Sequence, residues 1–334
     1  MKKLSRQSFE EIRLWMYRNA RHIELALWQY EFENGGAEAV LSALALYQND
    51  DGGFGNALEP DCWNPESSPY TTLNAINKLY NIGFTDINHP IIRGILSYLD
   101  SGAYRTENGW LFNIPSNNDY PRAPWWTYDP NANEIEHTGV TAEIVCFILE
   151  FVPEESDLYK LAFTYAEKLL VKFQTLENMG DMGLGGYCVL LEKIKQLGLE
   201  GEPGLEGRLG LEGRLDLEVR LDIAYLASVI KKHVDEAIVR DVSQWAGYCV
   251  RPSQFINTPD SPYYEGNEEI VNKELDYLID TRPGGGVWDI TWHWYDNYDK
   301  YPEAFAVARN WWKADMQIGA VGKLKFLRNF GRLE

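Results

Sequence analysis

Hydrophobic residues recur at three- and four-residue steps along most of the chain, which is the spacing of a helix that buries one face. In the segment 8–32 this stripe consists of Phe9, Ile12, Trp15, Met16, Ile23, Leu27 and Tyr30. The same spacing predicts roughly twelve helices in all, at 8–32, 37–47, 70–81, 89–99, 138–151, 157–173, 186–197, 217–231, 234–250, 267–279, 302–312 and 317–329. We therefore expect an all-α fold.

Long loops alternate with short links between these predicted helices. The long loops are rich in aromatic residues and proline, and they cover 53–69, 102–137, 251–265 and 281–301. Long ordered loops lose conformational entropy on folding and commonly carry function. If the helices pair into hairpins that alternate in direction around a ring, these loops lie together at one mouth of that ring.

The string QNDDGGFG, residues 48–55, ends the second predicted helix. Its glycines allow the positive φ that a sharp reversal needs. The string has the pattern Gln-x-x-x-Gly-x-aromatic, and RPGGGVW at 282–288 contains a second glycine-aromatic turn. Shorter strings of this kind occur at 107–110 and 185–187.

These strings resemble the QW repeat of the terpenoid cyclases and protein prenyltransferases, with Phe54 where tryptophan is usual. The resemblance implies an α/α toroid of about six helical hairpins, arranged as an inner and an outer ring of helices. In those families the repeat is structural, so the resemblance implies that Gln48, Phe54 and Trp288 tie hairpins together. It covers most of the chain as architecture, whereas only two strings match as motifs.

The catalytic signatures of these families are absent from the chain. It has no Asp-x-Asp-Asp string, whose acid protonates an alkene in class II cyclases, and Asp50-Asp51 lacks the third acid of the Asp-Asp-x-x-Asp motif of class I cyclases. Asp61 and Cys62 are adjacent, whereas the zinc site of the prenyltransferases has an Asp-x-Cys pair and a distant histidine. The resemblance favours an isoprenoid or similarly apolar substrate and leaves the reaction open.

Composition narrows the class of protein. At 334 residues the chain is long enough for one large core, and we expect a single domain over 1–334. With 31 basic and 50 acidic residues the net charge is −19, which opposes binding to nucleic acid.

No apolar run reaches membrane-spanning length, and charged residues follow the basic N-terminus where a signal peptide is apolar. We expect a cytoplasmic protein without a membrane-spanning segment, and nothing in the sequence specifies its oligomeric state.

One segment departs from the helical pattern. Residues 198–221 consist of the repeated strings GLEGEP, GLEGRL, GLEGRL and DLEVRL. A six-residue period is too short for a solenoid unit, and the glycines weaken helix formation. We expect a surface insertion between two helices, and its role is open.

Acids, histidines and aromatic side chains of the long loops are the candidate functional residues. For catalysis we select Glu59, Asp61, His137, Asp289 and His293. For substrate binding we select Trp125, Trp126, Tyr128, Tyr263, Tyr264, Trp292 and Trp294. Aromatic rings stabilise carbocations or stack on sugar faces, and paired carboxyl groups cleave glycosides. The alternative is a purely structural role, in which the rings pack the loops against the helices and the acids cap helix ends.

The acidic and histidine residues of the fourth loop have two alternative interpretations, a metal site and an acid pair. Asp289, His293 and Asp296 would share one face if this stretch were helical, and with the pair at 136–137 they could bind a divalent metal ion. The tryptophans around them indicate irregular backbone, which separates such side chains. We therefore assign no metal ligand, leave the cofactor open with a divalent metal ion as the candidate, and favour an acid pair between Asp289 and a carboxyl group of the first loop, Glu59 or Asp61.

Three classes of function follow from these observations. The first is a terpenoid cyclase- or prenyltransferase-like enzyme with a small-molecule or lipid-like ligand in an aromatic cavity. The second is a carbohydrate-active (α/α)6-barrel enzyme that uses paired carboxylates. The third is a binding toroid without catalysis. A deep, dry, aromatic pocket would favour the first class, and an acidic cleft would favour the second.

Overall fold

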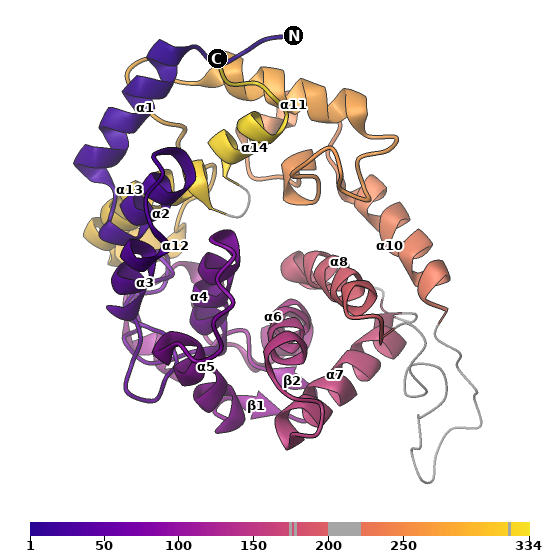
Figure 1. The fold of residues 1–334 in the computed structure, drawn as a ribbon. Helices are drawn as coiled ribbons and strands as arrows, with labels where there is room; N and C mark the ends of the chain where they lie inside the picture. Colours follow the sequence, from indigo (N-terminus) through magenta and orange to yellow (C-terminus); the bar gives the residue numbers. More distant parts are fainter. Residues whose placement is uncertain (174–175, 177–178, 200–221, 320–321) are drawn as a thin grey trace.

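The computed structural model describes residues 1–173, 176, 179–199, 222–319 and 322–334, which are mostly helical (Figure 1). Its α-helices are α1 (Arg6–Asn19), α2 (His22–Phe32), α3 (Ala37–Ala45), α4 (Pro69–Asn81), α5 (Pro90–Asp100), α6 (Pro130–Phe151), α7 (Asp157–Phe173), α8 (Gly180–Gln196), α10 (Ile223–Ala237), α11 (Glu268–Thr281), α12 (Asp296–Lys300), α13 (Pro302–Ile318) and α14 (Lys323–Asn329). The prediction of a mainly α-helical chain is confirmed.

Short elements occupy parts of the long loops. A hairpin of two-residue antiparallel strands, β1 (Arg105–Thr106) and β2 (Gly109–Trp110), is accompanied by the 3-10 helices η1 (Pro115–Asp119), η2 (Pro124–Trp126), η4 (Val242–Ala246) and η5 (Pro252–Gln254). None of the described helices is both long enough and apolar enough to cross a lipid bilayer. The predicted insertion at 198–221 falls outside the described residues except for 198 and 199.

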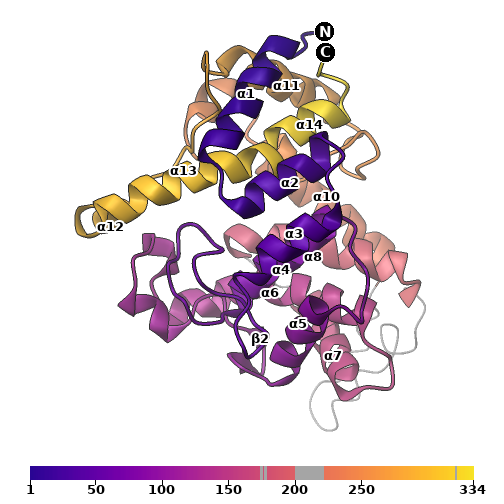
Figure 2. The same cartoon turned by 60° about the vertical axis from the view of Figure 1, so that its left-hand side comes forward.

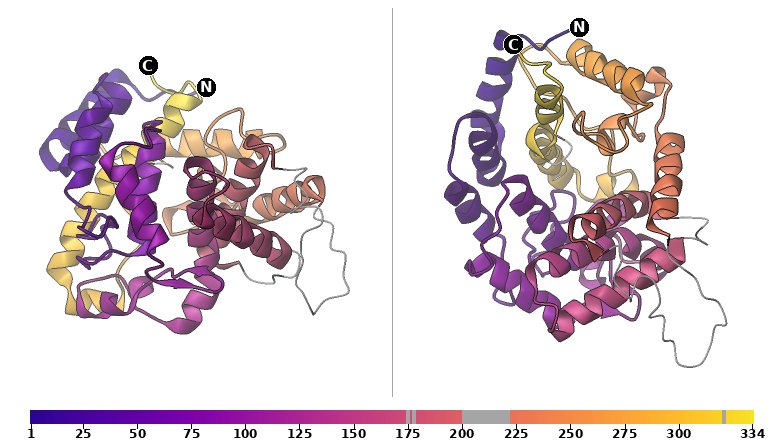
Figure 3. Two further views of the ribbon diagram at one scale, coloured as in Figure 1. Left: turned by 60° about the horizontal axis from the view of Figure 1, so that its bottom comes forward. Right: turned by 45° about the vertical axis from the view of Figure 1, so that its right-hand side comes forward.

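The helices lie at two distances from the middle of the molecule. In Figure 1, α1, α11, α10, α7 and α5 follow its periphery, while α14, α4, α6 and α8 lie nearer the centre, and the right-hand view of Figure 3 shows the same arrangement. Figure 2 shows α13 as a long helix that leads from α12 and passes close to α2. The two chain ends meet, because Leu4 and Leu333 form a parallel bridge and the Leu4 N–H donates to the Arg332 carbonyl at 2.8 Å.

The turn at 48–55 fixes three consecutive helices. Gln48, just after α3, donates from its side chain to the carbonyl oxygens of Gly52 (2.9 Å) and Ile91 in α5 (3.1 Å). Phe54 is fully buried, and its N–H donates to the Thr72 hydroxyl of α4 at 3.0 Å. Gly52 has φ 87°, and a Cβ at this position would lie 2.1 Å from the Gly94 carbonyl oxygen of α5. Only glycine allows so close an approach between turn and helix.

The hairpin β1–β2 repeats this contact one helix pair later. The Trp110 N–H donates to the Thr141 hydroxyl of α6 at 3.0 Å, just as Phe54 does to Thr72 of α4. Trp110 is likewise fully buried, and Gly109 before it has φ 131°. The shorter glycine-aromatic string at 107–110 is therefore a second copy of the same structural device.

Helices α6 and α8 pack closely against each other. A Cβ on Gly186 of α8 would lie 2.8 Å from the Cα of Gly139 in α6. Glycines at both positions let the two backbones approach, and they bring Val140, Ile144 and Leu190 into the core.

Several predicted helix boundaries are wrong. The segment 8–32 is two helices, because the backbone of Ala20 and Arg21 between them is extended. Helix α6 begins at Pro130 and not at 138, since the Asp129 side chain caps it by accepting the Asn131 N–H at 2.8 Å. Proline at the first helical position strengthens this start.

The helices predicted at 234–250, 302–312 and 317–329 also differ. Helix α10 ends at Ala237, and Asp241 then starts η4 by accepting the Ser243 N–H at 3.0 Å. Helix α13 continues to Ile318, so α14 is short. The uniform hydrophobic spacing hid these ends because the capping signals lie within it.

Candidate functional site

The long loops are joined to one another by hydrogen bonds. The Ala123 N–H of the second loop donates to the Asp61 carbonyl of the first at 2.8 Å. From the fourth loop, the Asn297 amide donates to the Arg122 carbonyl at 2.9 Å. Segments far apart in the sequence therefore meet at one region of the molecule.

Asp61 lies where the first and fourth loops meet. Its side chain is buried, at 1% exposure, and its two carboxylate oxygens accept the indole N–H of Trp292 (2.9 Å) and of Trp294 (2.7 Å). Burial raises the pKa of Asp61 to about 6, and the two indole donors oppose this rise. A predicted catalytic acid and two predicted substrate-binding rings thus lie in direct contact.

Glu59 is buried beside Asp61. One of its oxygens accepts the Asp61 N–H at 3.3 Å and the other accepts the Asn74 amide at 3.4 Å. Burial and the neighbouring Asp61 raise the pKa of Glu59 to about 8. The ion pair between the buried Lys78 and the half-buried Asp315, at 2.9 Å, lies close enough to act on Glu59 electrostatically.

A second buried ion pair positions the loop that carries these acids. Arg21 at the start of α2 pairs with Glu24 through bonds of 3.0 and 3.1 Å. Its remaining guanidinium donors reach the carbonyl oxygens of Ala57 (2.7 Å) and Leu58 (3.2 Å). A planar guanidinium with several donors can fix backbone in this way. The loop before Glu59 is therefore held to α2.

A cavity of about 170 Å³ lies next to this acid cluster. Its walls contain rings, carboxyl groups and cations, contributed by Tyr248, Cys249, Arg251, Ser253, Gln254, Glu274, Leu278, Thr291, Trp292, Trp312, Asp315, Met316, Gly319, Gly322 and Lys323. Trp292 links the two features, since it lines the cavity and donates to Asp61. Trp292 and Trp312 meet edge to face, with ring centroids 5.3 Å apart.

Glu274 and Asp315 are the two carboxyl groups of the cavity wall. Glu274 of α11 accepts the Ser253 N–H (2.8 Å) and the Ser253 hydroxyl (2.7 Å), and its contact with the Arg251 guanidinium is 3.9 Å. Burial raises the pKa of Glu274, although Ser253 and Arg251 oppose this. Asp315 of α13 is paired with Lys78. The cavity therefore presents acids from two separate helices.

Asp289 and His293 have other contacts. Asp289 is ion-paired with Arg309 of α13, with Nε to Oδ1 at 3.0 Å. Burial raises the pKa of Asp289, but the Arg309 hydrogen bonds outweigh it and leave the pKa below its usual value. The His293 side chain is exposed and packs against the rings of Tyr298 and Phe305, both 4.5 Å away. Neither residue lines the cavity.

The predicted residues of the second loop lie elsewhere. His137 was expected in a loop, but it is buried within α6 because that helix begins at Pro130. Burial, and then Lys172, lower its pKa to about 4. Trp126 is in the core, with its ring 4.3 Å from that of Tyr70. Trp125 is 37% exposed, and Tyr128 is half-buried.

The third loop reaches the cavity through residues that were not predicted. Tyr263 is buried, and Tyr264 packs its ring 5.4 Å from that of Phe330, so both serve the core. Ser253 and Gln254 of η5 line the cavity instead. Both have polar side chains, as is suitable for a cavity wall that contains two carboxyl groups.

Glu274 and Lys323 were missed because they belong to predicted helices, and Asp315 was missed because it lies in the short link 313–316 between two of them, outside the long loops. A signal for one of them is present in the sequence. In α11 the buried stripe contains Ile270, Val271, Leu275 and Leu278, and Glu274 lies within that stripe. A charged residue at a buried helix position requires a partner or a function.

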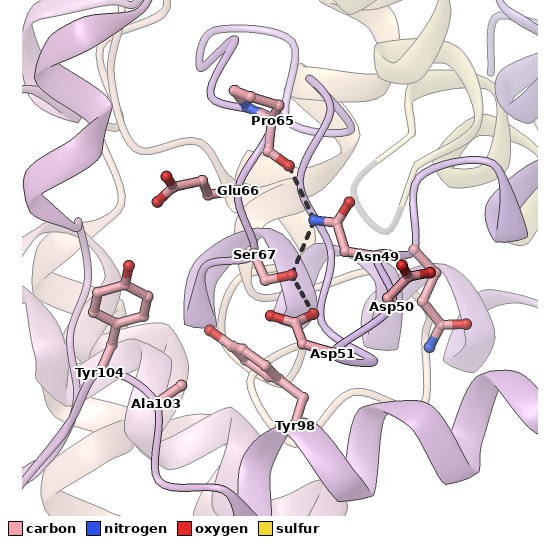
Figure 4. A pocket seen from close by; sticks show the side chains of 10 residues that line it. Asn49, Asp50, Asp51, Pro65, Glu66, Ser67, Tyr98, Ala103 and Tyr104 are labelled. Carbon is pink, nitrogen blue, oxygen red and sulfur yellow. Dashed lines mark hydrogen bonds between the residues drawn. The ribbon is translucent and has the colours of Figure 1, made fainter.

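A separate groove of about 800 Å³ lies beside the turn at 48–55 (Figure 4). Its acidic and aromatic lining includes Asp51, Glu66, Tyr98 and Tyr104. Asp51 accepts the Ser67 hydroxyl at 2.6 Å and the Gly53 N–H at 2.9 Å. The bond to Ser67, drawn in Figure 4, holds the turn to the following loop.

Within the described part of the chain, no group of three or more His, Cys, Asp or Glu side chains is placed to hold a metal ion. Comparison with models of protein families, with curated proteins and with solved structures found no significant match to this chain.

Proposed function

We propose that this chain is an α/α toroid whose cavity near Trp292 is the active site of a carbohydrate-active enzyme. The toroid is supported by the two equivalent turn contacts, from Phe54 to Thr72 and from Trp110 to Thr141. It is supported also by the peripheral and inner helices of Figure 1 and by the contact between the chain ends.

The observation that carries the proposed activity is the composition of one cavity wall. Glu274 and Asp315 line it together with Trp292 and Trp312. Tryptophan rings stack on the apolar faces of sugar rings, and a pair of carboxyl groups supplies the acid and the base of glycoside cleavage. A volume of about 170 Å³ is below the range of drug-sized sites and suits one small ring.

The same wall argues against an uncharged isoprenoid ligand. A hydrocarbon chain has no groups to pair with Arg251 or Lys323, so binding it would leave these two cations desolvated without compensation. A hydroxylated ligand can donate to the carboxylates and accept from the cations. The cavity lining therefore favours the carbohydrate class.

In this proposal the two carboxyl groups have different roles. Glu274 has a raised pKa because it is buried, which suits a general acid. Asp315 is paired with Lys78 and acts as the second carboxylate. Asp61 does not reach the ligand, and instead positions the Trp292 ring through its hydrogen bond.

The test is a search for turnover. The protein is incubated with a panel of oligosaccharides and aryl glycosides, and in a parallel arm with prenyl diphosphates, and the products are identified by mass spectrometry. We expect cleavage of a glycoside, and a loss of at least about 100-fold in rate for Glu274→Gln. The matched control is Glu269→Gln, which changes an exposed residue of the same helix.

Three results would contradict the proposal. Consumption of a prenyl diphosphate but of no glycoside would identify the isoprenoid class. Glycoside cleavage that Glu274→Gln leaves unchanged would place the reaction elsewhere. Binding of sugars without any turnover would favour a non-catalytic toroid.

A further inference from the structure

Lys323 is a nearly buried cation that faces the cavity. It is the first residue of α14, its exposure is 8%, and it lines the cavity wall. Among the residues that the structure describes, its ammonium group has no ion pair and no hydrogen bond, and the Trp288 ring lies 5.8 Å away. An unpaired buried charge is costly unless a ligand compensates it.

Arg251 provides a second positive group on the same wall. Its closest contact with an acid is the 3.9 Å separation between Nε and the Glu274 carboxylate, which is longer than a hydrogen bond. The two Glu274 oxygens are instead engaged by Ser253. Arg251 and Lys323 are close enough to repel each other, because Arg251 contributes to lowering the pKa of Lys323.

We propose that Lys323 and Arg251 together bind an oxyanionic substituent of the ligand, so that the cavity selects an acidic sugar over a neutral one. This inference rests on the proposed carbohydrate function and specifies its substrate class. A carboxylate or a phosphate would accept charge-assisted hydrogen bonds from both groups, while the sugar ring contacts Trp292 and Trp312.

The charges around Lys323 are consistent with this assignment. Burial, and then Arg251, lower the pKa of Lys323 to about 7, whereas Glu274 and Asp289 raise it. Asp315, the other acid of the wall, is already paired with Lys78. A bound oxyanion would restore the balance of charge and hold the proton on Lys323.

The experiment measures the affinities of three ligands that share one ring. Glucuronate, glucose 6-phosphate and glucose are titrated into the full-length protein by isothermal calorimetry. We expect at least one of the two anionic ligands to bind about tenfold or more tightly than glucose. The stronger of these two identifies the substituent as a carboxylate or a phosphate.

Variants then test the two cations. Lys323→Met is expected to lose about tenfold or more of the preference for the anionic ligand over glucose, whereas Lys325→Met, two residues further along α14 and outside the cavity wall, keeps that preference. Affinity of the unaltered protein for the anion should fall as the pH rises above about 7, and that of Lys323→Met should not. If Lys323→Met does not fold, Arg251→Met takes its place.

Equal affinity for glucose and both anions would overturn the inference, as would undiminished anion binding by Lys323→Met. Cleavage of neutral glycosides that is independent of Lys323 would refute this inference alone. Anion binding that depends on Lys323, without cleavage of any glycoside, would refute the proposed enzyme activity and leave the anion site standing.

Discussion

Glu59→Gln offers a quantitative test of the buried acid cluster. Glu59 is fully buried beside Asp61, and its pKa is raised to about 8 from a usual value of 4.5. The folded protein therefore holds this proton more tightly than the unfolded chain does. The stability that the proton confers is present below about pH 4.5 and is lost progressively as the pH rises towards about 8.

The size of the effect follows from the pKa. A rise of this magnitude corresponds to roughly 4–5 kcal/mol of folding free energy between the two ends of the pH range. Glutamine has nearly the shape of the protonated carboxyl group and never ionises. Glu59→Gln should match the original protein in stability near pH 4.5, and exceed it by several kcal/mol near pH 8.

Urea unfolding at several values between about pH 5 and about pH 9 measures this difference directly. The control is Glu11→Gln, whose stability difference from the original protein should stay nearly constant over this range. Hydrogen bonds from Arg282 and Gln7 lower the pKa of Glu11, so its contribution is fully present above about pH 4.5 and is lost only below that value. A difference between the original protein and Glu59→Gln that stays constant over this range would refute the reasoning.

Three further predictions use the same unfolding assay. Trp292→Phe removes one hydrogen-bond donor from Asp61. It should lower stability by about 1–3 kcal/mol more at pH 8 than at pH 5, because the hydrogen bond is strongest to the ionised carboxylate. An equal loss of stability at the two pH values would contradict this prediction. Gly186→Ala should cost about 1–3 kcal/mol, since the new Cβ would lie 2.8 Å from the Gly139 Cα, and an unchanged midpoint would show that the helices can separate freely. Lys323→Met should stabilise the protein at and below about pH 7, where the buried lysine is charged. This gain in stability should fade towards pH 10.5, because the lysine of the unfolded chain also loses its proton there. A variant that is less stable than the original protein at pH 7 would contradict the prediction.

The helical content could be predicted from local sequence signals. Hydrophobic spacing located helices such as α7, whose observed bounds are those predicted. The unusual composition of the long loops predicted only that they lie together, and Asp61 of the first loop accepts hydrogen bonds from Trp292 and Trp294 of the fourth. The predicted pairing of Asp289 with an acid of the first loop is not seen, because Asp289 pairs with Arg309.

The cavity could not be predicted because it depends on contacts between helices. Glu274, Asp315 and Lys323 come from α11, α13 and α14, and periodicity reveals only which face of each helix is buried. His137 lies in α6 and not in a loop for a different reason, since Asp129 caps the helix at Pro130, eight residues before the start that hydrophobic spacing predicts.

A crystal structure of Glu274→Gln, soaked with the tightest-binding sugar, tests the central claim most directly. The account predicts the sugar ring against Trp292 and Trp312, with its reactive carbon between positions 274 and 315 and its anionic substituent at Lys323. A cavity left empty at a saturating ligand concentration, or a sugar bound only at another place on the molecule, would contradict the account.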